Sequence, residues 1–317
     1  MAEKVLVMFS GGLDSRLAVK IMQEQGLEVV ALFFSLPFGT GCCDEGCSFN
    51  FSQLHGMNLK IVDCTKGDNL KEYLDVIRKP LYNRGSGINP CVDCRLFMFK
   101  KAREIADEMG IEMVVSGEVL GERPMSQMRK SMRIVEEESG LKGRLLRPLS
   151  AKFMEETIGE KKGYIDRSKL YSIEGRQRVK QIELAKKFKI NYPTPAGGSL
   201  LCEKALSRRF LTLLERDLSG NQMKILEIGR HFIIDGVWVA IGRYAKENQI
   251  IETFGKEGEV AITEGFPGPT SVIFDDCSDE AREKVKELVL AYSKKGSLEA
   301  REKFEKLIAL TEEGTEE

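Results

Sequence analysis

The chain has 317 residues, of which 42% are hydrophobic and 31% are charged, and its formal net charge is -1. This length and composition are typical of a globular protein with one large domain or two ordinary ones. The nearly neutral charge excludes a global electrostatic signature of nucleic-acid binding. No apolar run approaches the length of a bilayer span, and the N-terminus lacks the apolar stretch of a signal peptide. We therefore expect a cytoplasmic protein that makes no use of a membrane.

The first half of the chain alternates short apolar segments with amphipathic ones. Strands are predicted at residues 4–9, 27–34, 59–62, 113–116 and from 145, and helices at 15–25, 70–76 and 96–109. The strands lack a polar face, which is typical of strands that are covered on both sides. The pattern predicts an α/β fold in which a doubly wound parallel sheet carries helices on both faces.

A cluster of Pro and Gly at residues 192–198 predicts a domain boundary. We place the first domain at 1–195, a smaller α+β domain at 196–275 and C-terminal helices at 276–317. Beyond the boundary we expect a helix at 207–216, strands at 232–234, 237–241 and 250–254, and helices at 279–293 and 298–310.

Eight cysteines in a chain expected in a reducing compartment do not indicate a disulfide framework. Six of them fall within residues 42–94, whereas Cys202 and Cys277 stand apart. This clustering favours metal binding, an iron–sulfur cluster or sulfur chemistry.

The first predicted strand runs directly into Ser-Gly-Gly-Leu-Asp-Ser at residues 10–15, and a helix follows. Gly11 and Gly12 allow a close approach of the backbone to a ligand, and the N–H groups of a helix N-terminus favour a phosphate. Ser10 and Ser15 add hydroxyl groups. Asp14 would repel a bare phosphate, so its presence indicates an intervening Mg²⁺ ion. The turn has no Walker lysine and does not match the P-loop pattern.

Residues 10–15 resemble the PP-loop of the ATP pyrophosphatase superfamily. Enzymes of that superfamily split ATP between its α- and β-phosphates, adenylate a carbonyl oxygen and release pyrophosphate. The resemblance implies an adenine nucleotide alpha hydrolase-like fold, ATP and Mg²⁺ as cofactors, and a pyrophosphate site at the turn. It also places Ser116 and Gly117 at the nucleotide, and we count Phe34, at the end of the second strand, among the nucleotide-binding residues.

Asn-Pro-Cys-Val-Asp-Cys at residues 89–94 opens the helix predicted from 96. It resembles the element of tRNA 2-thiouridylases and related sulfurtransferases that carries cysteine beside the ATP site. The resemblance implies that Cys91 and Cys94 act in catalysis together with a third, later cysteine. Cys202 is the candidate here, although relatives have a cysteine directly after Gly-Gly, where this chain has Ser199.

Two routes for the sulfur remain open. In one, a cysteine persulfide attacks the adenylated uracil and a second thiolate releases the product, leaving a disulfide. In the other, which we favour, Cys91, Cys94 and Cys202 hold a [4Fe–4S] cluster whose open iron binds hydrosulfide. The sulfur comes from sulfide or from a cysteine desulfurase relay. The rival set of cysteines comprises Cys42, Cys43 and Cys47. Three alternatives stay open for it: metal binding, sulfur relay or no role.

Lysine and arginine outnumber the acidic residues in two segments, 123–152 and 174–189. They predict a phosphate-binding strip for tRNA or another RNA, with an ordinary solvated face as the alternative. The loop at 123–127 is placed at the substrate base by the resemblance. Short motifs at 229–232 and 242–248 resemble the RNA-binding module of NFACT proteins, and His231 in the first motif is expected to be a buried structural residue. The candidate RNA-binding residues are Arg123, Gln127, Arg129, Arg176, Arg178, Arg230 and Arg243.

The interpretation that unites these features is an enzyme, an ATP-dependent tRNA sulfurtransferase that thiolates a uridine. One alternative is a PP-loop amide synthetase acting on a small molecule, for which the cysteine pair would have no use. The other is a non-enzymatic iron–sulfur RNA-binding protein, which the intact turn at 10–15 disfavours.

Overall fold

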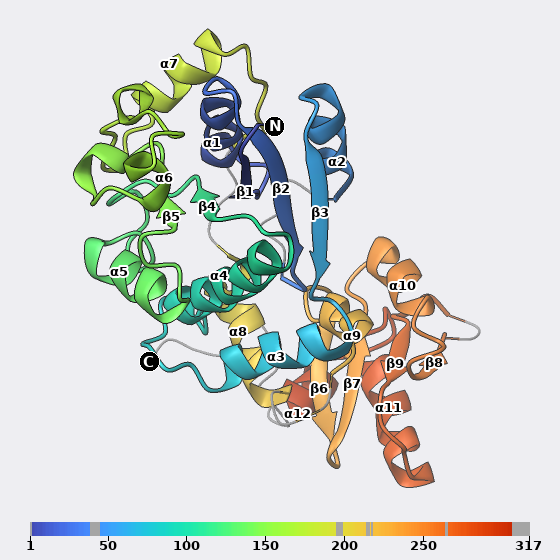
Figure 1. Ribbon diagram of the computed structural model, residues 1–317. Coiled ribbons are helices and arrows are strands. Elements are labelled where there is room, and N and C mark those ends of the chain that lie inside the picture. The colour runs from blue at the N-terminus through green and yellow to red at the C-terminus, as the bar shows by residue number, and fades with distance from the viewer. Residues whose placement is uncertain are drawn as a thin grey trace. The chain divides into compact units, whose positions relative to one another are not determined.

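The computed structural model describes residues 2–38, 45–194, 199–213, 216, 218–263 and 266–305. Within it the chain divides into two compact units. The first unit comprises Met1–Gly85 and Asn89–Ser199, and the second comprises Ser86–Ile88 and Leu200–Glu317. Each unit contains its own β-sheet (Figure 1).

The sheet of the first unit has five strands in the order β3-β2-β1-β4-β5, and every neighbouring pair is parallel. The strands are β1 (Lys4–Met8), β2 (Glu28–Ser35), β3 (Asn58–Asp63), β4 (Met113–Ser116) and β5 (Leu145–Leu146). This sheet confirms the predicted α/β fold. The chain leaves β1 toward β2 on one side and places β4 on the other, so the carboxyl ends of β1 and β4 form a topological switch point, where ligands of such sheets bind.

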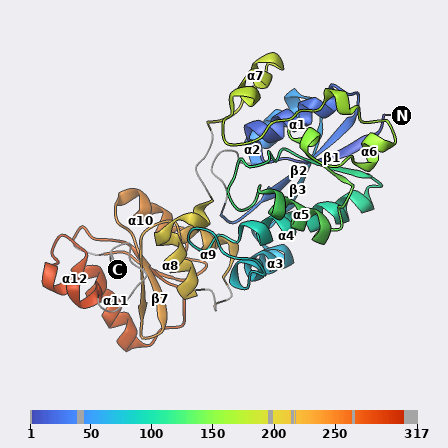
Figure 2. The same cartoon turned by 90° about the vertical axis from the view of Figure 1, so that its left-hand side faces the viewer.

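Helices cover both faces of this sheet. They are α1 (Leu13–Gln23), α2 (Glu45–Leu54), α3 (Gly67–Arg78), α4 (Cys91–Glu108), α5 (Arg129–Glu138), α6 (Ile158–Lys161) and α7 (Val179–Lys187). Figure 2 shows α1 and α2 on one face and α3, α4 and α5 on the other. Among the described residues, no helix is long and apolar enough to cross a membrane.

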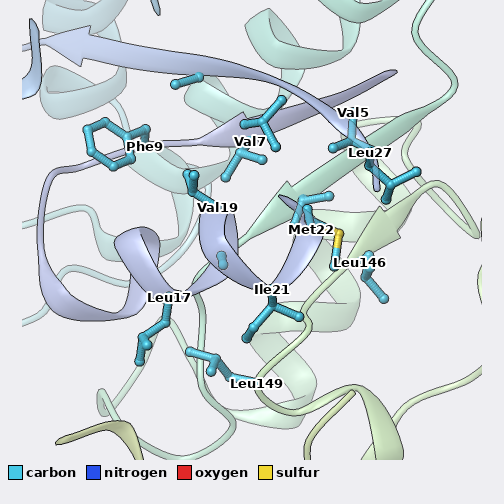
Figure 3. Close-up of a cluster of buried hydrophobic side chains, with 14 of the residues drawn as sticks. Val5, Val7, Phe9, Leu17, Val19, Ile21, Met22, Leu27, Leu146 and Leu149 are labelled. Carbon is cyan, nitrogen blue, oxygen red and sulfur yellow. The ribbon is translucent and has the colours of Figure 1, made fainter. Parts of the chain in front are cut away.

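The core under α1 explains why these elements pack (Figure 3). Val5 and Val7 are two residues apart on β1, so their side chains point to the same face of the sheet. Val19 and Met22 lie three residues apart on α1, on the side of Val5 and Val7 in Figure 3, and both are 0% exposed. Burying such side chains contributes about 1.5–3 kcal/mol each, which anchors the start of α1 at the end of β1.

The second unit has an antiparallel sheet in the order β6-β7-β9-β8. Its strands are β6 (Arg230–Ile234), β7 (Val237–Ile241), β8 (Glu259–Ala261) and β9 (Ser271–Ile273). Its helices are α8 (Lys204–Leu213), α9 (Gly220–Ile225), α10 (Ala245–Glu252), α11 (Asp279–Ala291) and α12 (Leu298–Glu305). Val285 and Leu288 of α11 and Phe304 of α12 share one core with this sheet, so the described part of the C-terminal helices packs on it.

One predicted strand is wrong. Residues 250–254 lie at the end of α10 and in the turn that follows, not in a strand. Ile251 and Phe254 are 0% and 5% exposed, whereas Ile250 is 38% exposed. Burial at a spacing of three residues follows the helical period and not the strand period of two.

The division between the units falls after Ser199. Residues 195–198, in the predicted boundary, lie outside the described residues, as does the end of the helix predicted at 298–310. The three-part domain division therefore stays a prediction.

Candidate functional site

The turn between β1 and α1 has the backbone of an anion site. Gly11 has φ +73°, a left-handed conformation that favours glycine. The first helical hydrogen bond of α1 runs from Arg16 N to Gly12 O (3.1 Å). The N–H groups of residues 13–15 therefore precede it and lack a helical partner. Ser15 Oγ donates to Gly12 O (2.9 Å), which keeps this hydroxyl at the turn.

Arg16, which we did not single out from the sequence, stabilises the turn through hydrogen bonds of its guanidinium group. Its Nε donates to Gly11 O (2.6 Å) and its Nη1 to Asn191 O (2.8 Å). Its Nη2 donates to Cys47 Sγ (3.2 Å), and its guanidinium lies 4.4 Å from the centre of the Phe51 ring. The only sequence signal for this role is its place directly after Ser15.

Asp14 lies in the first turn of α1, and its Oδ1 is buried without a hydrogen bond among the described residues. Burial, followed by the charge of Glu122, raises the pKa of Asp14 to about 7, although Arg178 and Arg123 act against this. A buried carboxylate oxygen without a protein partner fits a hard cation such as Mg²⁺, which prefers oxygen ligands. The residue thus fits the expected metal.

Ser116 and Gly117 come to the same place from the end of β4. A Cβ atom added to Gly117 would lie 2.6 Å from the backbone C and O atoms of Asp14 and from Ser15 N. The segment that follows β4 is therefore in close contact with the start of α1. Ser116 is buried, and its Oγ accepts from Glu118 N (3.1 Å). The half-buried Phe34 lies next to the last residue of β2.

The segment that follows β4 contacts the start of α7 at Glu122, which is 7% exposed. Arg178 donates to its Oε1 from Nε (2.9 Å) and Nη2 (2.6 Å), and Gln181 Nε2 donates to its Oε2 (3.3 Å). The Oε1 atoms of Gln181 and Gln127 are buried and without a partner among the described residues. Arg178, expected on an RNA strip, thus pairs with Glu122, and the charges of both residues act on Asp14. Sequence reasoning missed Glu122 and Gln181.

The cysteine pair lies at the start of α4. Cys91 is the first residue of the helix and Cys94 lies one turn on, so both face the same side. Cys94 Sγ is 3.8 Å from Tyr73 Oη, and burial raises the pKa of the Cys94 thiol. Asp93 has a structural role, because its carboxylate accepts from Leu81 N (2.7 Å).

The Cys91 thiol and the loop at 123–127 meet at Gly85. A Cβ added to Gly85 would lie 3.0 Å from Met125 Sδ and 3.6 Å from Cys91 Sγ. Met125 has φ +71°, which is rare for a residue with a side chain and typical of functional loops. The structure thus brings one predicted sulfur-carrying cysteine to the loop predicted to hold the substrate base.

The third predicted cysteine belongs to the second unit. Cys202 ends a 3-10 helix at Leu200–Cys202. Within that unit, Leu201 O accepts from Ile88 N (3.0 Å) and Cys202 O accepts from Ser86 Oγ (3.4 Å). In the part of the chain that the structure describes, no three Cys, His, Asp or Glu residues are grouped to hold a metal. Cys42 and Cys43 lie outside that part.

The candidate RNA-binding residues fall in both units. Arg123 and Arg176 are exposed, and Arg129 Nη1 donates to Phe153 O (3.0 Å). In the second unit, Arg230 lies 5.2 Å from the Tyr292 ring centre, and Arg243 pairs with Glu247 (2.7 Å).

His231 is fully buried, which confirms its expected structural role. Its Nδ1 accepts from Trp238 Nε1 (3.0 Å), so Nε2 is left to donate to Ile228 O (2.8 Å). Burial lowers the pKa of His231 to about 3, which keeps the ring neutral at physiological pH.

Known proteins are similar to part of this chain. A tRNA-specific 2-thiouridylase MnmA of Petrotoga mobilis is 33% identical over 136 residues, which cover 37% of this chain and 36% of that protein. A probable tRNA sulfurtransferase of Thermococcus kodakarensis is 31% identical over 159 residues, covering 49% and 39%. The matched segments thus span less than two fifths of these relatives.

A solved structure, a 4-thiouridine synthetase–RNA complex with bound ATP, covers 71% of this chain and 51% of its own, with 20% identity and a TM-score of 0.37. The family model described as thiamine biosynthesis protein (ThiI) matches residues 1–161, just over half of the 317 residues. The family model and the two sequence relatives confirm the resemblance to PP-loop tRNA-thiolation enzymes, whereas the NFACT-like module stays a prediction. The chain belongs to the ThiI family.

Proposed function

We propose that this protein is an ATP-dependent sulfurtransferase that thiolates a uridine of tRNA in the cytoplasm. One observation carries the proposal: the Cys91 thiol and Met125 converge on Gly85, and the same loop brings Arg123 and Glu122 to Asp14. A nucleotide-binding turn and a cysteine pair are thereby joined through one loop. The sequences of the relatives support the same chemistry.

In the first step the uracil carbonyl oxygen attacks the α-phosphorus of ATP, and pyrophosphate leaves. The N–H groups at the start of α1, with Ser10, Gly11, Gly12 and Ser15, would hold the departing phosphates. Asp14 would hold Mg²⁺, which neutralises the phosphate charge. Ser116, Gly117 and Phe34 would line the nucleotide site.

In the second step a sulfur nucleophile attacks the carbon of the adenylated uracil carbonyl, and AMP leaves with the former carbonyl oxygen. Cys91, Cys94 and Cys202 would hold a [4Fe–4S] cluster, which supplies an open iron site for hydrosulfide. The two cysteines of α4 fit such a cluster as i, i+3 ligands. Cys202 belongs to the second unit, so its part in the cluster rests on the sequence resemblance alone.

The substrate would be bound by the basic side chains of both units. Arg123 and Gln127 would contact the base, while Arg129, Arg176, Arg230 and Arg243 would contact phosphates. Arg178 would act through its pair with Glu122. The sulfur would come from sulfide or a cysteine desulfurase relay.

The cluster is tested by iron and acid-labile sulfide analysis after anaerobic purification. We expect about four of each per chain, as for a [4Fe–4S] cluster, and their loss in Cys91→Ala, Cys94→Ala and Cys202→Ala. Cys277→Ala, a half-buried cysteine of the second unit, is the matched control. An iron-free wild type would reject the cluster and leave the persulfide route.

The reaction itself is tested by measuring pyrophosphate release from ATP and thiouridine in tRNA. Cys91→Ala should still release pyrophosphate when tRNA is present but form no thiouridine, because adenylation does not use the thiol. Absence of both products from the wild type, supplied with sulfide or a persulfide donor, would reject the proposed function.

A further inference from the structure

A buried ion-pair network connects the start of α4 to the end of β4. The side chain of Glu118 is 3% exposed, and its Oε1 accepts from Arg95 Nη1 at 2.6 Å. Its Oε2 accepts from Arg147 Nε at 2.9 Å. Arg147 is itself 1% exposed and donates from Nη1 to Glu136 Oε2 at 2.8 Å. Two guanidinium groups and two carboxylates thus balance in charge.

The position of these residues in the chain gives the network its significance. Arg95 directly follows Cys94 in the first turns of α4. Glu118 directly follows Gly117, which lies against the backbone of Asp14. A single carboxylate therefore links the helix that carries both cysteines to the segment that packs on the nucleotide-binding turn.

The energetics favour a role in specifying geometry. Taking charges out of water costs several kcal/mol per ion, so a buried pair often adds little net stability compared with apolar residues of similar size. Burial on its own would raise the pKa of Glu118, but Arg95 and Arg147 lower it, so the carboxylate stays ionised. An ionised, bidentate carboxylate between two guanidinium groups accepts few alternative arrangements.

We propose that Glu118 is a positioning residue that holds the first turns of α4 against the end of β4, so that Cys91 and Cys94 face the carbonyl activated at the start of α1. This inference rests on the proposed function, because it assigns the residue to the alignment of its two steps. Glu118 touches neither the nucleotide nor the sulfur in this role; it acts through Arg95.

Glu160 provides a matched control for the loss of a buried carboxylate. Its side chain is 2% exposed and pairs with Arg167 at 2.6 Å, and the Arg167 side chain is 28% exposed, close to the 24% of Arg95. It belongs to α6 and forms a capping box with Thr157. Glu160→Gln therefore removes a comparable ion pair from the same unit without touching α4.

The experiment compares wild type, Glu118→Gln and Glu160→Gln for thiouridine formed per pyrophosphate released. In Glu118→Gln we expect pyrophosphate release within a few-fold of wild type and a ratio lowered about tenfold or more, since misplacement by ~1 Å can cost on the order of 10²-fold. Glu160→Gln should keep the wild-type ratio. An unchanged ratio in Glu118→Gln, or an equal fall in both variants, would overturn the proposal.

Native-state hydrogen exchange gives a readout that does not depend on the reaction. We expect faster exchange of the amides of residues 95–97 in Glu118→Gln than in wild type and Glu160→Gln. If wild type forms no thiouridine, the proposed function fails, and this exchange alone decides whether Glu118 positions α4. Equal exchange at these amides in all three proteins would reject the positioning role.

Discussion

At the scale of single residues, Asp14 shows how a site is built at the expense of stability. Its Oδ1 is buried without a hydrogen bond among the described residues, and the charge of Glu122 adds to the cost of ionising it. The nearby Arg178 is already engaged by Glu122. Such an arrangement is costly in the folded protein and useful when a cation binds.

The first prediction concerns Asp14→Asn. The pKa of Asp14 is raised from 3.8 to about 7, so the folded state binds the proton more tightly than the unfolded state. The contribution of Asp14 to the free energy of unfolding is therefore most favourable below pH 3.8, and this stability is lost as pH rises through about 7. By linkage the ionised carboxylate then costs up to about 4 kcal/mol.

Asp14→Asn should therefore raise the thermal midpoint of the ligand-free protein more at pH 8 than at pH 5, while abolishing pyrophosphate release. Thermal melts at both pH values measure this, with the exposed Asp68→Asn as the control. A gain that is equal at the two pH values would contradict the assigned cause.

At the scale of elements, α4 depends on its first turn. Pro90 stands at the N-cap, and Asp93 is 5% exposed inside the turn between the two cysteines. Its carboxylate accepts from Leu81 N at 2.7 Å and from Tyr82 N at 3.1 Å. The loop before the helix is thus tied to the cysteine pair by one side chain.

The second prediction is that Asp93→Ala lowers the free energy of unfolding by about 1–3 kcal/mol, because two backbone donors lose their acceptor. Glu104→Ala, in the same helix, removes a surface ion pair with Arg103 and should cost less than about 1 kcal/mol. Urea unfolding measures both changes. Equal costs would show that the Asp93 contacts contribute no more than a surface pair.

Predictability at this scale followed the strength of the local pattern. The first four strands and α4 are marked by apolar runs or a long amphipathic stretch, and the structure confirms them. Residues 250–254 contain Ile, Ile and Phe, which also suit a strand, so only packing in the second unit decided for α10. Helix α2 was not predicted.

At the scale of the whole molecule, each unit has a core of its own. Asp14, Gly117 and Glu122 all belong to the first unit. A ligand that binds only the folded form of that unit stabilises it by an amount set by ligand concentration and affinity.

The third prediction is that Mg²⁺ with a non-hydrolysable ATP analogue shifts one of two calorimetric unfolding transitions. At 100 times the dissociation constant the first unit should gain about 2.7 kcal/mol, whereas the second unit should unfold as it does without ligand. Asp14→Asn serves as the non-responding control. Equal shifts of all unfolding signals would show a single cooperative unit.

The sequence by itself determined the α/β class, the strand–turn–helix at residues 10–15 and a helix after the cysteine pair, which the structure begins at Cys91 and not at residue 96. These features depend on neighbours within a few residues, where spacing and residue type specify the backbone. The contacts of Arg16, Glu118 and Arg178 were decided only by the tertiary structure. Glu118 finds Arg147 29 residues away and Arg178 finds Glu122 56 residues away. The packing of the sheet and its connections determines such partners, so they cannot be predicted from a local sequence pattern.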